Sequence, residues 1–281
     1  MRIKKKSMYT KLNRLQQTLA ELGHVAVAFS GGVDSTFLMK VAHGVLADRA
    51  LAITALSGLF PAREIEEARE FASANGIRHI VYRMDEFSIA GFAENPPNRC
   101  YLCKKNLFSR FKKIAAQQDI SCLVEGSNVD DDDDYRPGAQ AIRELGVVSP
   151  LRDAGFTKAE IRLLSLEMGL STWDKPSFAC LASRFPYGET ITREGLKAVE
   201  SAERILFDLG FRQVRVRHHG HLARIELDPA EMEKMMAPDI RETVYGGIQQ
   251  AGFAYVTLDI RGYRTGSMNE TISIPTTDAK K

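Results

Sequence analysis

Short apolar runs alternate with amphipathic stretches over the first half of the chain. Leucines at helical spacing predict a first helix, namely Leu12, Leu15, Leu19 and Leu22. The apolar runs predict four buried strands, at 24–29, 50–56, 77–84 and 121–127, and the stretches between them predict helices at 35–46, at 61–75 and from about Tyr101. This alternation predicts an α/β fold with a doubly wound parallel sheet, whose ligand crevice lies at the carboxyl ends of the strands.

The pattern changes after Pro186. A helical stretch at 192–210 precedes residues 211–228, which alternate with a period of two on both sides of a His-Gly turn and predict a β-hairpin. A helix near 229–250 and a strand at 253–260 complete the pattern. A chain of 281 residues is long for one compact core. We therefore expect two domains, residues 1–185 and a smaller α+β domain at 186–281.

Composition excludes several classes of protein. The formal net charge of +2 is too small to argue for a nucleic-acid partner. The basic start of the chain lacks the apolar core of a signal peptide, and no apolar run approaches the ~20 residues that cross a bilayer. Four cysteines do not make a disulfide framework, so they are expected to be reduced thiols, metal ligands or reactants. We expect a cytoplasmic protein with no membrane partner.

The stretch FSGGVDS follows the first predicted strand directly. Gly31 and Gly32 can take positive φ and have no side chains that would exclude a ligand. Backbone N–H groups at the start of the next helix would then point into one concavity, with hydroxyls from Ser30 and Ser35 as further donors. Asp34 would orient the loop or hold Mg²⁺. The alternative is a tight steric turn, but the complete strand–SGGVDS–helix unit favours a phosphate site.

These residues resemble the PP-loop of the ATP pyrophosphatase superfamily, which cleaves ATP to AMP and pyrophosphate and usually adenylates a second substrate. The stretch VEGSNVDDDDDYRPG at 124–138 resembles the partner motif of that fold. The resemblance implies a set of further ATP-binding residues, Gly126, Ser127, Asn128, Asp130 and Arg136. The Asp130–Asp134 run alone would be a solvated loop, but its place directly after a strand favours an active-site loop.

Three further stretches, 98–108, 179–192 and 258–270, resemble the LarE family of ATP-dependent sulfur transferases, and the match spans residues ~10 to 270. The resemblance implies a PP-loop domain, a smaller domain for substrate binding and oligomerisation, and a homo-oligomer. It also implies the reaction: AMP is attached to a carboxylate of pyridinium-3,5-biscarboxylic acid mononucleotide, and a sulfur atom then displaces AMP. Adenylation makes sense chemically, because it replaces an oxide leaving group by a phosphate anion.

The incoming sulfur must be a thiolate or a cluster-bound sulfide. Cys180 is the candidate, although a lone cysteine is normally a small buried hydrophobe. Arg184 is close enough in sequence to lower its pKa or to hold a phosphate.

The resemblance to LarE leaves two routes open. Either Cys180 gives up its own sulfur and becomes dehydroalanine, or three cysteines, Cys100, Cys103 and Cys180, hold a [4Fe-4S] cluster that carries the sulfide. The Cys100–Cys103 spacing favours the cluster, although zinc sites and redox dithiols share it. His79 or Cys122 could only be guessed as a fourth zinc ligand, and Cys122 lies in a strand as a core thiol.

The hairpin contributes basic side chains. Alternation places Val214 and Val216 on one face and Arg215 and Arg217, with Arg224 from the return strand, on the other. This face is either a solvated basic surface or the site of the substrate phosphate. Glu226 is also expected to face outward and, with Asp228, could bind a cation.

Two other functions compete with this one. A tRNA sulfurtransferase would also combine a PP-loop with three cysteines, but the low net charge and the absence of interleaved aromatic and basic residues count against it. A sensor that binds ATP or AMP without catalysis is the alternative outside the enzymes.

Overall fold

The computed structural model describes residues 2–131, 137–176, 179–264 and 267, and it divides the chain into two compact units. The first unit comprises residues 1–90 and 98–178, and the second comprises 91–97 and 179–281. Sequence analysis placed a single boundary near 186. The structure differs because segment 91–97 is bound to the second unit: the Asn95 side chain donates to the carbonyls of Phe185 and Pro186, and Ile191 N–H donates to the Ala93 carbonyl.

The first unit is built on a parallel four-stranded sheet in the order β3-β2-β1-β4. Its strands are β1 (Val25–Ala28), β2 (Ala50–Leu56), β3 (Arg78–Arg83) and β4 (Cys122–Val124). Six residues of β2 are buried, as expected of a strand covered on both faces. The predicted α/β fold with a parallel sheet is confirmed.

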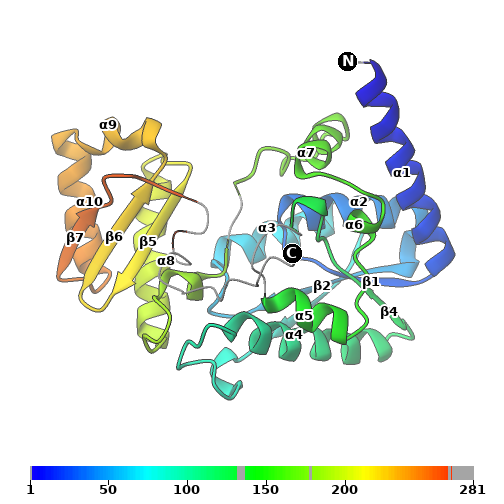
Figure 1. The fold of residues 1–281 in the computed structure, drawn as a ribbon, viewed down its shortest axis with the longest axis horizontal. Coiled ribbons are helices and arrows are strands. Elements are labelled where there is room, and N and C mark those ends of the chain that lie inside the picture. The colour runs from blue at the N-terminus through cyan, green and yellow to red at the C-terminus, as the bar shows by residue number, and fades with distance from the viewer. Residues whose placement is uncertain (1, 132–136, 177–178, 265–266, 268–281) are drawn as a thin grey trace, which may run out of the picture. The chain divides into compact units, whose positions relative to one another are not determined.

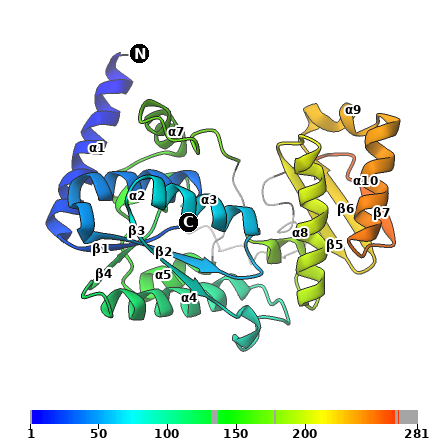
Figure 2. The same ribbon diagram turned by 180° about the vertical axis from the view of Figure 1, so that it is seen from behind.

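The helices of the first unit are α1 (Arg2–Leu22), α2 (Val33–Leu46), α3 (Ala62–Ala74), α4 (Arg99–Ala116), α5 (Pro137–Glu144), α6 (Pro150–Asp153) and α7 (Lys158–Glu167). Figures 1 and 2 show α2 and α3 on one face of the sheet and α4 and α5 on the other. The predicted leucine stripe of α1 is confirmed, because Leu12, Leu15 and Leu19 are buried in the core together with Phe37 of α2.

The second unit combines three α-helices with a small mixed sheet in its described part. Its elements are α8 (Arg193–Asp208), β5 (Val214–His219), β6 (Leu222–Leu227), α9 (Met232–Met235), α10 (Pro238–Gln250) and β7 (Tyr255–Leu258). β5 and β6 form the predicted antiparallel hairpin around Gly220, which has a φ of +60°, and β7 joins β6 in parallel. The expected small α+β domain is confirmed.

The single helix predicted near 229–250 is wrong. A 3₁₀ turn at Pro229–Glu231 leads into α9, and α10 begins only at Pro238. Proline lacks the N–H that a helix interior needs and holds the preceding residue in an extended conformation, as Ala237 shows with φ −60° and ψ 132°.

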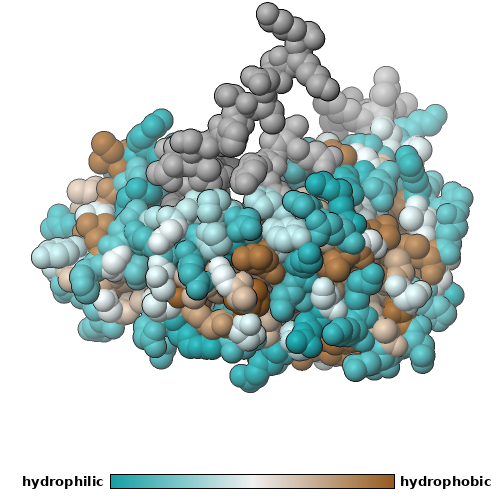
Figure 3. Space-filling view, turned by 60° about the horizontal axis from the view of Figure 1, so that its bottom comes forward, coloured by the Kyte–Doolittle hydropathy of each residue, from teal (hydrophilic) through white to brown (hydrophobic). Residues whose placement is uncertain are grey.

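The surface drawn in Figure 3 is mainly hydrophilic, with small scattered apolar groups. Among the residues that the structure describes, no helix combines the length and apolar character needed to cross a membrane.

Candidate active site

The glycine loop joins the end of β1 to the start of α2. Gly31 has a φ of +72°, and a Cβ there would lie 3.2 Å from the Glu64 carbonyl oxygen and 3.3 Å from the Ala68 Cβ. Only glycine therefore fits this position. Gly32 does not adopt the positive φ that the sequence allowed for both glycines. Its φ is −79°, a value that any residue can adopt. Its role is to be the N-cap of α2.

Two hydroxyl groups organise the loop from inside. Ser35 Oγ accepts a hydrogen bond from the Ser30 N–H at 3.2 Å and donates to the Gly32 carbonyl at 3.2 Å. It also lies 3.0 Å from Ser30 Oγ. The loop thus has a defined form at the N-terminus of the 14-residue helix α2, where backbone N–H groups and the helix dipole favour an anion.

The second motif packs against this loop, because β4 pairs with β1 in parallel. A Cβ on Gly126 would lie only 3.1 Å from the Ser35 nitrogen and 3.3 Å from the Asp34 carbonyl carbon. The Asn128 side-chain amide donates to Asp34 Oδ1 at 3.4 Å. The structure therefore brings together the two motifs that lie about 90 residues apart in the sequence.

Lys158, the first residue of α7, is a member of this site that sequence reasoning missed. Its Nζ donates to Asp34 Oδ2 at 2.5 Å, and its backbone N–H donates to Asp130 Oδ2 at 2.8 Å. Burial raises the pKa of Asp34, and the ammonium of Lys158 opposes that shift. The only sequence signal nearby is the capping box from Thr157 to Glu160, which marks a helix start and gives no hint of its partner.

The acidic run begins as an ordered turn. Asp130 N–H donates to Asn128 Oδ1, and Asn128 N–H donates to Asp131 Oδ2, both at 3.0 Å. Ser127 donates its hydroxyl to Glu125 Oε2 at 2.8 Å. These contacts hold the loop beside Asp34. Arg136 and the rest of the acidic run lie outside the described residues.

Cys100 and Cys103 are the second and fifth residues of α4, which begins two residues earlier than predicted. Their i, i+3 spacing places them on neighbouring positions of the helix surface, and Arg99 Nη2 lies 3.6 Å from Cys100 Sγ. Cys180 directly precedes the 3₁₀ turn Leu181–Arg184 and belongs to the second unit. All three thiols are partly exposed and outside any disulfide. Within the described ranges, no group of three or more His, Cys, Asp or Glu suited to a metal ion is found.

The other two candidate ligands have structural contacts. His79 Nε2 lies 2.8 Å from Thr54 Oγ1 on the adjacent strand, and its ring packs edge-on against Phe29. Cys122 packs against the main core, and burial raises its pKa. The prediction of a core thiol at Cys122 is confirmed.

Arg184 has a different environment from the one predicted. Its guanidinium is buried and forms a two-pronged pair with Glu203 of α8, with Nε–Oε1 at 2.7 Å and Nη2–Oε2 at 3.0 Å. Its remaining nitrogen donates to the carbonyls of Ala179 and Cys180. These contacts fix the backbone that carries Cys180.

Arg215, Arg217 and Glu226 are buried, which corrects the expectation that they face outward, whereas the side chain of Arg224 is 33% exposed. Arg217 is 5% exposed and pairs at 2.7 Å with Glu226, which is fully buried. Arg215 lies over the Tyr263 ring at 5.1 Å, and burial lowers its pKa to about 10. Arg217 is covered by residues far from it in the sequence, because it donates to the Ser183 carbonyl and to the Ser267 hydroxyl, both at 3.0 Å.

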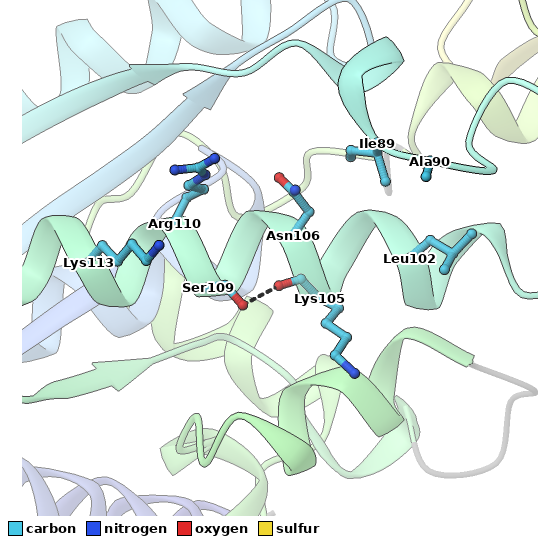
Figure 4. A pocket seen from close by; sticks show the side chains of 8 residues that line it. All are labelled: Ile89, Ala90, Leu102, Lys105, Asn106, Ser109, Arg110 and Lys113. Atoms are coloured by element: carbon cyan, nitrogen blue, oxygen red, sulfur yellow. Dashed lines mark hydrogen bonds between the residues drawn. The ribbon is translucent and has the colours of Figure 1, made fainter.

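A separate surface cavity of about 410 Å³ runs along α4 (Figure 4). It is lined by Ile89, Ala90, Leu102, Lys105, Asn106, Ser109, Arg110 and Lys113. None of the predicted site residues lines it, although Leu102 lies between the two cysteines of the helix.

The chain is similar to known proteins over nearly its whole length. No family model matches the chain. The chain is 39% identical over 268 residues to pyridinium-3,5-bisthiocarboxylic acid mononucleotide synthase of Lactiplantibacillus plantarum. The aligned residues make up 95% of this chain and 96% of the relative. It is 42% identical over 264 residues to an uncharacterized protein of Synechocystis sp., covering 94% and 98%.

A more distant relative supports the α/β fold class. Argininosuccinate synthase of Haloarcula marismortui is 29% identical over 161 residues, which is 53% of this chain and 38% of that protein. The parallel sheet, the glycine loop and the 39% relative lead to one assignment: the chain belongs to the pyridinium-3,5-bisthiocarboxylic acid mononucleotide synthase family, the LarE family of PP-loop sulfur transferases.

Proposed function

We propose that this protein is an ATP-dependent sulfur transferase that converts a carboxylate of pyridinium-3,5-biscarboxylic acid mononucleotide into a thiocarboxylate, a step in nickel-pincer nucleotide biosynthesis. The observation that carries the proposal is the 39% identity over nearly the whole of both chains to a synthase with this product class in its name. The preformed glycine loop beside Asp34 supports it, because the reaction needs a site for ATP.

The ATP phosphates would bind at the start of α2. Ser30, Gly31, Gly32 and Ser35 offer backbone and hydroxyl donors there, and Gly126 permits the close approach of the second motif. The groups beside them, Asp34 and Asp130, are carboxylates, the hard oxygen donors that Mg²⁺ prefers. When bound, Mg²⁺ would neutralise charge on the phosphates. Ser127, Asn128 and Arg136 complete the proposed ATP-binding set.

The sulfur step would use Cys180. Adenylation turns the carboxylate into an acyl phosphate, and a thiolate is a nucleophile strong enough to displace AMP. Arg184 supports this step by holding the Cys180 carbonyl at 3.4 Å, so it positions the backbone. Three partly exposed thiols outside any disulfide, Cys100, Cys103 and Cys180, fit the donor set of an iron–sulfur cluster, which would supply the sulfide when bound. The alternative within the same reaction is loss of sulfur from Cys180 itself.

The substrate phosphate would bind in the second unit near Arg215 and Arg217. In the described part of that unit, Arg217 Nε is a buried donor without a hydrogen-bond partner. Burial also opposes the charge of Arg215, as its lowered pKa shows. An anion would satisfy the free donor and stabilise that charge. Assembly into a homo-oligomer stays a prediction.

Pyrophosphate release from ATP, with and without the mononucleotide, tests the proposal. We expect release by the wild type, its loss in Asp34→Ala, and unchanged release but no thiocarboxylate in Cys180→Ala. Absence of release by the wild type under every condition would contradict an enzyme and favour a nucleotide sensor. Iron content after anaerobic purification, and the mass of the protein after turnover, distinguish the two sulfur routes: loss of one H₂S from Cys180 means sacrifice.

A further inference from the structure

Lys175 lies at the end of the first unit, and its side chain turns back to the glycine loop. We propose that Lys175 is a positioning residue of the ATP site, which holds the loop in its phosphate-binding form and ties to it the segment that leads to Cys180. The inference rests on the proposed ATP cleavage for its functional meaning. Its structural basis lies entirely within the first unit.

Three acceptors surround the Lys175 ammonium. Its Nζ lies 3.2 Å from the Gly31 carbonyl oxygen, 2.7 Å from Glu64 Oε2 and 2.5 Å from Glu67 Oε2. An ammonium has three N–H donors, so these acceptors match its capacity. The side chain is 11% exposed and that of Glu64 is 8% exposed, which makes this pair far more shielded than a surface ion pair.

The contact with Gly31 determines how the loop presents its donors. In a planar trans peptide, the carbonyl of one residue and the N–H of the next point in opposite directions. Lys175 holds the Gly31 carbonyl on the α3 side, so the Gly32 N–H is directed to the opposite side of the loop, where it donates to Ser30 Oγ at 3.4 Å. Gly31 is in the left-handed region, where glycine has several accessible conformations, and the peptide needs such a contact to keep one orientation.

The local charge argues for positioning rather than for direct phosphate binding. Glu64 and Glu67 both compensate the charge of Lys175, and Arg63 lies 3.7 Å from the second carboxylate oxygen of Glu64. Burial raises the pKa of Glu64, and the contact with Lys175 opposes this shift. An ammonium already shared between two carboxylates and a carbonyl has no N–H left for a phosphate oxygen.

The backbone around Lys175 is anchored as well. Arg162 of α7 donates from Nη1 to the Trp173 carbonyl and from Nη2 to the Lys175 carbonyl, both at 2.7 Å. Lys175 precedes the last residue of the first unit, Phe178, by three positions and Cys180 by five. The attachment point of the cysteine segment is thus bonded directly to the loop that would bind ATP.

The test compares Lys175→Met with Lys11→Met in the full chain. Lys11 forms a 2.7 Å pair with Glu160 in the same unit. We expect Lys175→Met to raise the Kd and KM for ATP about tenfold, a loss comparable to one charged hydrogen bond. We also expect it to lower the thiocarboxylate formed per pyrophosphate released. Lys11→Met should leave both quantities within twofold of the wild type.

Two further variants keep the outcome clear. Lys175→Arg retains the pair with Glu64 and should restore most of the ATP affinity if Lys175→Met folds poorly. Glu67→Gln, at a half-exposed partner, should change the Kd little. A folded Lys175→Met protein with wild-type Kd for ATP and wild-type coupling overturns the inference. ATP binding by the wild type without pyrophosphate release would instead overturn the proposed function, and the Kd comparison would still decide the role of Lys175.

Discussion

The carboxylate of Asp34 is subject to two opposing influences. Burial favours its protonated form, while the contact with Lys158 favours the charged form. Because the pKa of Asp34 is raised in the folded state, ionisation of this carboxyl destabilises the fold as the pH rises above the pKa that Asp34 has in the unfolded chain. The Lys158 ammonium reduces this loss of stability. The proposed role of Asp34 requires the charged form, so Lys158 should extend activity to lower pH.

The matching prediction concerns Lys158→Met. Loss of the ammonium removes the influence that lowers the pKa of Asp34, so the acid limb of the pyrophosphate-release profile should move to higher pH. Rates of pyrophosphate release measured from about pH 5 to pH 8 would show this shift, because the pH dependence of an enzyme's rate reports the pKa of its essential ionisable group. Lys158→Arg keeps the positive charge and should retain the wild-type limb. An unchanged limb in Lys158→Met would disprove the coupling.

Contacts between elements leave little room where the chain after β4 meets the start of α2. Gly126→Ala should raise the KM for ATP, because its Cβ would lie 3.1 Å from the Ser35 nitrogen and displace the loop. Gly44→Ala in α2 is a matched control, because a Cβ there meets no atom within 4 Å. That variant should gain up to about 1 kcal/mol of stability from helix propensity alone. KM and thermal unfolding of both variants check the prediction, and an unchanged KM in folded Gly126→Ala would refute it.

For several helices and strands, the local sequence pattern was sufficient to predict the observed structure. The leucine spacing of α1, the alternation of β5 and β6 and the glycine turn between them all predicted the observed structure. Local rules failed where an element depends on distant residues. Arg217 of the hairpin is buried because segments before α8 and after β7 cover it, and period-two alternation contains no information on such cover.

The whole molecule consists of two compact units, so a substitution that destabilises one unit should increase local unfolding there without affecting the other unit. Glu203→Gln leaves buried Arg184 without its charge partner, which should cost about 3–5 kcal/mol of stability in the second unit. Hydrogen exchange should accelerate in α8 and β5 while β1 and β2 keep their protection. Glu194→Gln, at an exposed position of the same helix, should show little change. Equal acceleration in both units would contradict separate stability.

The sequence by itself determined the order of the strands, the glycine loop at the end of the first strand and the family to which the chain belongs. These features depend on spacing of a few residues or on motifs of fixed order. The two-unit division was visible as well, but its boundary was displaced because Asn95 and Arg184 act through partners some 90 and 19 positions away.

Only the tertiary structure decided which charged groups complete the site. Lys158 and Lys175 contact the loop across 124 and 144 positions, and no local pattern distinguishes them from surface lysines. Likewise, the sequence left Arg215 and Arg217 as either a solvated surface or a phosphate site, and nothing in it indicated that Arg184 is buried. The three arginines are buried because the fold places carboxylates, carbonyls and an aromatic ring around them, and a buried charge is stable only where such partners converge.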